Sequence, residues 1–451
     1  MKGAWLLPLL LATPAGLAAQ SAPVVPDSVL AEHVRDSFRH AWEGYRRYAW
    51  GHDELKPLSK TSHDWYATSL LMTPVDSYDT MLLMGLRAEA AEARALIRER
   101  LSFDVDQSVQ VFEIVIRHLG ALLASYQLDG DSLFLRLAAD LGDRLLPAFD
   151  SPTGMPYRFV NLRTGATSGP VSNPAEIGTL LLEFGTLSRL TGNPAYYDKA
   201  KRAVSEVYRR RSSVTGLVGT TIDVRTGEWQ NRDSHVSGAI DSYYEYLLKS
   251  WLLFGDRDFE QMWRSSIAAV HRHLLDDRFA TLWYGHADMD TGARASPRFG
   301  ALDAFLPGVL ALAGDTARAG RLMLSVYRMW ATFGIEPEAM DYERMSVVNG
   351  GYPLRPESIE SAWYLYRLTG NPLYRDMGRH MYDALVRTAR TDAGFASVAD
   401  VRTGELEDEM PSFLLAETFK YAWLLFAPPG VVDLERVVFN TEAHPLAHSA
   451  R

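Results

Sequence analysis

The chain has 451 residues, of which 47% are hydrophobic and 23% are charged, a composition typical of a globular protein with a large core. Its formal net charge is −10 and it has no run of basic residues, which argues against nucleic acid as a partner because phosphate binding needs clustered Lys and Arg. It contains no cysteine, which excludes disulfides, thiolate zinc sites and cysteine nucleophiles.

The N-terminus has the pattern of an export signal. Lys2 precedes an apolar run over residues 4–12, and small residues follow up to Ala19. This pattern predicts a cleaved signal peptide over residues 1–19, although a buried first helix is an alternative. The run is too short to span a bilayer, and we predict no membrane span further along the chain. We therefore expect the mature chain to be soluble and either periplasmic or secreted.

A turn signature recurs along the rest of the chain: a hydrophobic residue, any residue, Gly, and then Asp or Asn. Each occurrence follows one apolar, helix-like stretch and precedes another. Gly supplies the left-handed residue that ends a helix, and Asp or Asn caps the next helix. The glycines lie at intervals of 62, 63, 59 and 56 residues, and they are Gly130, Gly192, Gly255, Gly314 and Gly370. Looser copies of the signature occur at Gly85 and Gly430.

A period near 60 residues has room for two helices and their loops. Seven such hairpins predict an all-α protein, an (α/α)7 barrel that forms a single domain over residues 20–450. Short Gly- and Thr-rich stretches, such as 218–224 and 394–401, predict minor β-hairpins between the helices. An open solenoid of the same hairpins is the alternative, because sequence spacing does not show whether the ring closes.

Acidic residues recur at a similar position within most of these periods. They precede the period's glycine by 17, 16, 14, 13 and 13 residues, and they are Glu113, Glu176, Asp241, Glu357 and Glu417. One acid at a helix start is usually a cap or a first-turn charge that the helix dipole favours. Several at matching positions predict a carboxylate-lined pocket at one rim of the barrel. Such a pocket suits a hard cation, and it suits the acid and base of glycoside hydrolysis.

Other functions are compatible with the same repeat. A different helical-barrel glycosidase or a polysaccharide lyase is one alternative, but a lyase needs Arg or Lys to neutralise a uronate, and this pocket is acidic. A purely structural helical repeat is another, but it leaves the recurring acids unexplained. The aromatic content of 11% suits a neutral polyhydroxyl ligand.

Several blocks in the same order resemble glycoside hydrolase family 47, the class I α-mannosidases that trim α-1,2-linked mannose from N-glycans. The resemblance covers about residues 45–446, and its blocks are 48–55 (YAWGHDEL), 76–80, 111–120, 241–249, 354–361, 412–420 and 439–446. It implies the same (α/α)7 barrel and the activity of a calcium-dependent, inverting exo-α-1,2-mannosidase. A mannose-binding lectin of the same fold is the alternative.

The resemblance also implies roles for individual residues. Glu113 matches a general acid that acts through a water, and Asp241 matches a second catalytic acid that some mechanisms make the proton donor. Glu357 matches the general base. Inversion implies that acid and base stand roughly 6.5–9.5 Å apart, which leaves room for the attacking water.

The expected cofactor is Ca²⁺, and Thr441 matches the residue that binds it through both its hydroxyl and its carbonyl oxygen. This expectation predicts that the C-terminal segment reaches into the barrel. The residues that match positions lining the site or contacting the sugar are Arg117, Glu176, Glu360, Phe413, Glu417 and Glu442. The expected partner is a mannose-containing oligosaccharide, and we expect a monomer.

Two positions depart from the endoplasmic reticulum enzymes of this family. Ala239 stands where they carry Arg, and Gly300–Ala301 stands where they carry an Asp-His pair. We therefore expect this chain to lack their branch selectivity, and to present a less polar surface to the sugar on that side. The absence of cysteine, together with a cleavable signal, predicts a bacterial member of the family.

Overall fold

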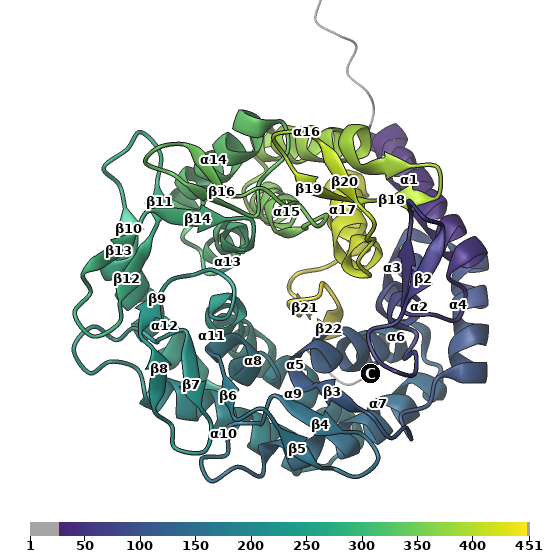
Figure 1. Cartoon of the computed structure of the whole chain (residues 1–451), viewed down its shortest axis with the longest axis horizontal. Coiled ribbons are helices and arrows are strands. Elements are labelled where there is room, and N and C mark those ends of the chain that lie inside the picture. The colour runs from purple at the N-terminus through teal and green to yellow at the C-terminus, as the bar shows by residue number, and fades with distance from the viewer. Residues whose placement is uncertain (1–26, 449–451) are drawn as a thin grey trace, which may run out of the picture.

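The structure is a computed structural model and describes residues 27–448. The predicted signal peptide, residues 1–19, lies outside the described residues, so export stays a prediction. Over the described range the chain forms a closed ring of helices around a central space (Figure 1).

Each predicted turn before Gly430 joins two helices that pack side by side, one facing the centre of the ring and one on its outside. The pairs are α3 (Tyr78–Met84) and α4 (Arg87–Arg100); α6 (Gly120–Asp129) and α7 (Ser132–Leu145); α9 (Leu181–Thr191) and α10 (Pro194–Arg209); α11 (Asp241–Phe254) and α12 (Arg257–His273); α13 (Leu306–Leu312) and α14 (Thr316–Phe333); and α15 (Glu357–Thr369) and α16 (Pro372–Ala389).

The turns have the predicted chemistry. Gly130 has φ +80°, and the Asp131 carboxylate accepts the backbone N–H of Leu133 at 2.9 Å to cap α7. A Cβ added at Gly130 would meet no atom within 4 Å, so the left-handed conformation, and not lack of space, requires glycine there. The other four glycines of the signature also have positive φ, and the caps that follow them are Asn193, Asp256, Asp315 and Asn371.

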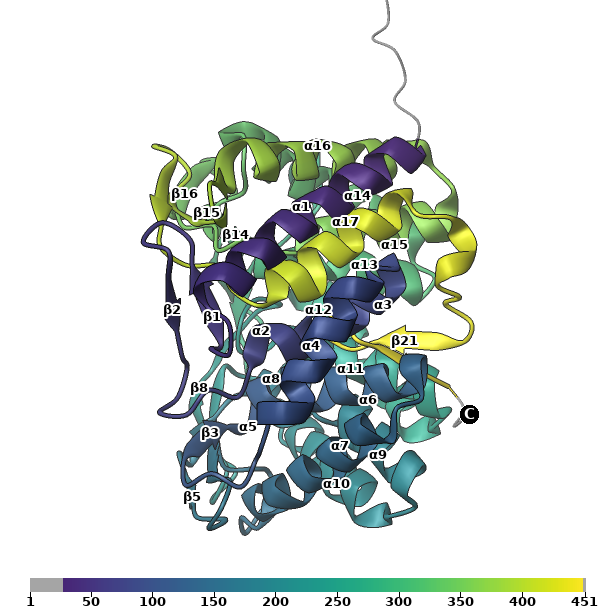
Figure 2. The ribbon, with the colours of Figure 1, turned by 90° about the vertical axis from the view of Figure 1, so that its right-hand side faces the viewer.

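The two ends of the chain close the ring. The last inner helix, α17 (Phe419–Phe426), packs along the first helix, α1 (Asp27–Tyr48), and Figure 2 shows the two side by side. This contact excludes the open solenoid. One prediction was wrong, because the turn at Gly430 leads into strand β21 and does not join two helices. The seventh helix pair is therefore assembled from opposite ends of the sequence.

Short antiparallel strands connect the helix pairs, as predicted, and most of them gather on one face of the ring (Figure 2). The three-stranded sheets are β3 (Ser108–Gln110), β4 (Phe159–Asn161) and β5 (Thr167–Ser168); β6 (Val171–Ser172), β7 (Thr221–Asp223) and β8 (Trp229–Asn231); β13 (Arg294–Ser296), β12 (His286–Asp288) and β9 (Asp233–Ser234); and β14 (Arg298–Gly300), β15 (Ala339–Asp341) and β16 (Ser346–Asn349). The two-stranded ones include β1 (Glu54–Lys56) with β2 (Thr61–His63) and β19 (Ser397–Asp400) with β20 (Glu405–Glu407).

The C-terminal segment enters the ring, as the expected position of Thr441 required. Strands β21 (Val437–Phe439) and β22 (Pro445–Ala447) form an antiparallel hairpin whose tip, residues 440–444, lies near the middle of the ring (Figure 1). The hairpin lies opposite the face that carries most of the short strands (Figure 2).

One helix, Val111–Asp129, is long and apolar enough to cross a membrane by length and composition alone. It is 72% buried inside the ring, so the helix belongs to the protein core, in agreement with the prediction of no membrane span.

Candidate active site

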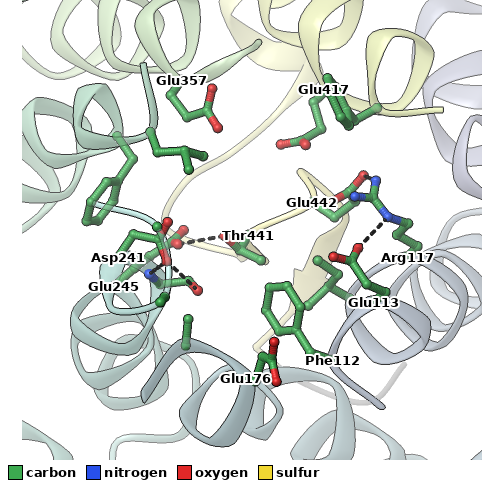
Figure 3. A pocket seen from close by; sticks show the side chains of 18 of the residues that line it. Phe112, Glu113, Arg117, Glu176, Asp241, Glu245, Glu357, Glu417, Thr441 and Glu442 are labelled. Atoms are coloured by element: carbon green, nitrogen blue, oxygen red, sulfur yellow. Dashed lines mark hydrogen bonds and ion pairs between the residues drawn. The ribbon is translucent and has the colours of Figure 1, made fainter. Parts of the chain in front are cut away.

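The inner helices and the hairpin tip enclose a cavity of about 480 Å³ (Figure 3). Every residue that the sequence suggested for the site lines this cavity. They are Glu113, Arg117, Glu176, Asp241, Glu357, Glu360, Phe413, Glu417, Thr441 and Glu442. The structure therefore brings the predicted set together, while the catalytic role of each residue stays a prediction.

The acids lie where the inner helices begin. Asp241 and Glu357 are the first residues of α11 and α15, and Glu113 lies in the four-residue helix α5 (Val111–Ile114). Glu176 lies in α8 (Pro174–Gly178), a short helix that precedes α9. At the start of α11 the Ser242 backbone N–H donates to the Asp241 carboxylate at 2.8 Å. Free N–H groups and the helix dipole favour carboxylates at these positions, which explains why acids recur there in the sequence.

Unusual backbone marks the same region. Arg117 and Glu417 lie in π-helical turns, Val115–Leu119 and Leu414–Thr418, and such turns often occur at functional sites. Three non-glycine residues beside the cavity have positive φ: Ala239 at 77°, Leu354 at 66° and Ala443 at 59°. Strained backbone of this kind persists only where the surrounding contacts hold it, and it is common at active sites.

One side of the cavity is organised around a buried guanidinium. Arg117 donates through Nε to Glu113 at 3.0 Å and through Nη1 to Glu442, and the Asp76 carboxylate lies 3.6 Å from the same Nη1. Its guanidinium also lies over the ring of Phe413, 5.6 Å from the centroid. Because the side chain of Arg117 is only 9% exposed, these carboxylates are the main compensation for its charge.

A buried network fixes the hairpin tip from below. His444 contacts Asp79 at 3.0 Å and Asp76 at 3.1 Å, and Lys420 donates to Asp79 at 2.9 Å and to the Ala443 carbonyl at 2.6 Å. Burial opposes a charged imidazole, but the two aspartates outweigh it and raise the pKa of His444. The tip that presents Thr441 and Glu442 to the cavity is therefore held by ion pairs in the core.

The opposite side of the cavity has acids without such partners. Loss of contact with water, together with the nearby Glu245 and Glu357 carboxylates, raises the pKa of Asp241 to about 7. The same desolvation raises the pKa of Glu357 to about 7, although Arg355 acts against it. It also raises the pKa of Glu360 to about 8. Carboxyl groups with these values exchange protons near neutral pH, as general acids and bases require.

Two further acids, Glu417 and Glu442, are also desolvated, and their pKa values lie well above the usual range. The Oε2 atom of the Glu357 carboxyl group is buried and has no hydrogen-bond partner within residues 27–448. The cavity as a whole therefore holds more carboxyl groups than its neighbouring cations compensate, and Glu442 is desolvated even beside Arg117.

The region around Thr441 fits a hard cation. The Thr441 hydroxyl donates to Glu245 at 2.8 Å, and its backbone N–H donates to the Tyr246 hydroxyl at 3.3 Å, which fixes the residue at the cavity floor (Figure 3). The surrounding groups are almost all oxygen donors, the ligand type that Ca²⁺ prefers, and the excess of carboxylate supplies the charge to balance it.

Glu176 lies apart from these groups, close to a second arginine. Its carboxylate pairs with Arg158 at 2.8 Å and accepts hydrogen bonds from Gln110 at 3.0 Å and Ser172 at 3.1 Å. Figure 3 shows it beyond Phe112 from the hairpin tip, at the edge of the labelled set. This position suits contact with a sugar more than participation in bond cleavage.

Two residues of the site were not selected from the sequence. Glu245 lies one helical turn after Asp241 and binds the Thr441 hydroxyl, so the i, i+4 spacing was the signal that would have found it. Arg355 directly precedes Pro356–Glu357, forms a two-point ion pair with Glu338 at 2.6 and 3.1 Å, and lies over the Phe413 ring at 5.7 Å. Arg355 lies within the block 354–361 of the resemblance, but no role was assigned to it.

Of the two departures from the endoplasmic reticulum enzymes, Ala239 lines the cavity and Gly300–Ala301 does not. The apolar side chains Leu302 and Phe305 also line the cavity. Gly300 is in β14, where an added Cβ would lie 2.2 Å from the Glu338 carbonyl, so backbone packing forbids a side chain there. The expected loss of branch selectivity stays a prediction.

Comparison with known proteins identifies the family. The profile of glycosyl hydrolase family 47 matches residues 37–448. The chain belongs to glycosyl hydrolase family 47. It is 38% identical to alpha-mannosidase I MNS5 of Arabidopsis thaliana, over 92% of this chain and 77% of that protein. It is also 38% identical to the human endoplasmic reticulum mannosyl-oligosaccharide 1,2-alpha-mannosidase, over 92% of this chain and 63% of that protein.

The fold of the family is confirmed by a solved structure. The alpha-1,2-mannosidase from Trichoderma reesei superposes with a TM-score of 0.86 at 28% identity, over 94% of this chain and 99% of that one. The helical barrel predicted from the turn period is therefore the family 47 fold. The relatives named here are eukaryotic and give no support to a bacterial origin.

Proposed function

We propose that this family 47 protein is a calcium-dependent, inverting exo-α-1,2-mannosidase that removes terminal mannose from oligosaccharides or N-glycans. The observation that carries the proposal is one cavity that joins Glu113, Asp241 and Glu357 with Thr441 at its floor. The 38% identity to a mannosyl-oligosaccharide 1,2-alpha-mannosidase supports the substrate class.

The catalytic roles are divided among Glu357, Asp241 and Glu113. Glu357 takes a proton from the attacking water, and Asp241 or Glu113 delivers a proton to the leaving oxygen, so that the attack and departure occur on opposite faces of the sugar. Arg117 and Phe413 form a wall against which the mannose ring packs. The hairpin tip closes the bottom of the cavity, which favours a chain end over an internal residue.

Thr441 would hold calcium through its hydroxyl and carbonyl oxygens, with water and sugar hydroxyls completing the shell. Bound there, calcium would fix two hydroxyls of the mannose and favour a distorted ring. Glu245, Glu360, Glu417 and Glu442 would orient the waters of that shell by accepting their hydrogen bonds.

The test is hydrolysis of α-1,2-mannobiose by the purified protein, with and without a chelator, with the released anomer followed by NMR. We expect β-mannose first, loss of turnover on chelation, and recovery with added calcium. Release of α-mannose would overturn inversion, and unchanged turnover with chelator would overturn the calcium requirement. Binding of calcium and mannobiose without turnover would favour the mannose-binding lectin.

A further inference from the structure

A second cluster of metal-binding side chains lies outside the cavity, on the sheet formed by β9 and β12. Ala287 pairs with Ser234 and Asp288 pairs with Asp233, so His286 comes directly opposite His235. Asp233 and His235 are two residues apart and therefore face the same side of their strand. Figure 1 shows this sheet at the rim of the ring, close to α11 and α12.

The three side chains present ligand atoms to one another. His286 Nδ1 lies 2.7 Å from Asp233 Oδ2, and His235 Nε2 lies 4.0 Å from the same oxygen. One ligand atom from each of the three falls within 4.8 Å of those of the other two. Donors of a tetrahedral zinc stand about 3.3 Å apart, so shifts of less than about 1 Å bring the set to coordination distance.

We propose that Asp233, His235 and His286 form a site for a borderline divalent metal ion, of which zinc is the physiological example. Two imidazoles and one carboxylate are the donor set that zinc accepts, whereas calcium prefers oxygen alone. The inference rests on this geometry and does not depend on the mannosidase reaction.

The environment of the two imidazoles suits metal binding. The side chains of His235 and His286 are 6% and 11% exposed, and that of Asp233 is 35% exposed, which leaves an open side for a further ligand. Burial, together with the neighbouring His286, lowers the pKa of His235 to about 3, so the ring is neutral at physiological pH and one of its two nitrogens has a lone pair free to bind a metal. A small cavity of about 100 Å³ lies beside His286.

Near His286 lies a buried carboxyl group, that of Asp303, which forms no hydrogen bond with the ring within residues 27–448. The Nε2 of His286 is buried without a hydrogen-bond partner in the described part of the chain, and so is Oδ1 of Asp303. His286 lies close enough to oppose, by its charge, the burial that raises the pKa of Asp303 to about 6. A metal on Nδ1 places the ring proton on Nε2, where a carboxylate commonly accepts it from a metal-bound histidine.

The site connects to the active-site loop through His235. The Ser237 N–H donates to His235 Nδ1 at 3.2 Å, and the Ser237 carbonyl accepts the N–H of Asp241 at 3.0 Å. The Nε2 proton of His235, which faces Thr220 at 3.2 Å, would shift to Nδ1 when a metal binds Nε2. Ser237 would then lose its acceptor, so the metal acts on the loop that begins α11.

The experiment is zinc titration by calorimetry of the full chain without a polyhistidine tag, in saturating calcium. We expect one zinc per chain, and a visible absorption spectrum of four- or five-coordinate Co²⁺ when cobalt replaces it. H286A and D233N should each weaken zinc binding more than about 100-fold. The control variants are H33A, at an exposed histidine of α1, and T441V, at the proposed calcium ligand, and both should bind zinc as the parent does.

Two results would overturn the site. One is the absence of stoichiometric zinc binding by the parent chain. The other is unchanged zinc affinity in both H286A and D233N, which would place the ion elsewhere. Because Asp233 is partly exposed, D233N keeps the test decisive if H286A fails to fold, and the thermal unfolding of each variant reports its folding.

Discussion

The two halves of the cavity hold the same chemical groups in opposite electrostatic settings. On one side Glu113, Glu442 and Asp76 surround the Arg117 guanidinium, so their charges have a fixed partner. On the other, Asp241 and Glu357 have pKa values near 7, because burial is not offset by a dedicated cation. The difference shows how one ring of carboxylates supplies both a rigid wall and groups that gain and lose protons at neutral pH.

The strongest test of the proton-exchanging half is Glu357→Gln. We expect kcat on α-1,2-mannobiose to fall about 10³-fold or more, because the attacking water loses its base. Stability at pH 8 should be unchanged or higher, because a desolvated acid has been replaced by a neutral amide. Steady-state kinetics and thermal unfolding measure the two effects. Glu405→Gln on the exposed strand β20 is the control, and a loss of less than tenfold would remove Glu357 from the base role.

A second test asks which half delivers the proton. Asp241 has the pKa suited to this role, so we expect Asp241→Asn to lose about 10²- to 10⁴-fold on mannobiose and much less on α-mannosyl fluoride, whose leaving group needs no proton. Glu113→Gln should be impaired on both substrates, because the group that orients Arg117 has been lost. If Glu113→Gln, and not Asp241→Asn, regains activity on α-mannosyl fluoride, then Glu113 is the proton donor.

Substitutions on the side of the cavity where carboxyl groups surround Arg117 should change the free energy of unfolding. Arg117→Met keeps the length of the side chain but leaves three carboxylates around an uncharged group, and we expect a loss of about 3–5 kcal/mol in the free energy of unfolding. Denaturant unfolding measures it. Arg98→Met is the matched control, because Arg98 is 60% exposed and pairs with Asp131 at the surface, where little change is expected. Equal losses in the two variants would mean that the buried pairing adds nothing.

The sequence predicted the features that depend on neighbouring residues, namely the helix ends, the caps and the period. A Gly followed by Asp or Asn specifies a helix end and the next cap within four residues, so the turns from Gly130 to Gly370 and the period were recovered. The position of each acid at a helix start followed from the same register. The seven-hairpin period also predicted a closed barrel, but not which helices close it, because the pairing of α1 with α17 joins the two ends of the chain.

The sequence also did not predict which acids of the site are paired with a buried cation. Glu113 and Glu357 read alike as acids near helix starts, yet Glu113 is hydrogen-bonded to the buried Arg117, whereas the arginine near Glu357, Arg355, is paired with Glu338. The π-helical turn around Arg117 and the network of His444 with Asp76 and Asp79 depend on contacts more than 300 residues apart. Spacing within one helix, in contrast, did contain the signal for Glu245.

The smallest expected effect combines calcium with pH. The pKa values of Asp241 and Glu357, near 7, and of Glu360, near 8, lie above their ordinary values of 3.8 for Asp and 4.5 for Glu. Between about pH 5 and 8 the folded protein without calcium therefore binds more protons than the unfolded chain, so its stability falls as pH rises. Bound calcium would replace those protons, and the fall should be shallower.

We expect the difference in Tm between calcium-saturated and chelated protein to grow by about 5 °C from pH 5 to pH 8. Thermal scans in both conditions across this range measure it. Glu357→Gln removes one carboxyl group whose pKa is raised. The chelated variant should therefore lose less stability between pH 5 and pH 8 than the chelated parent protein. Parallel curves for the calcium-bound and chelated protein would mean that the ion does not compete with these protons, and that the unpaired half of the cavity is not where calcium binds.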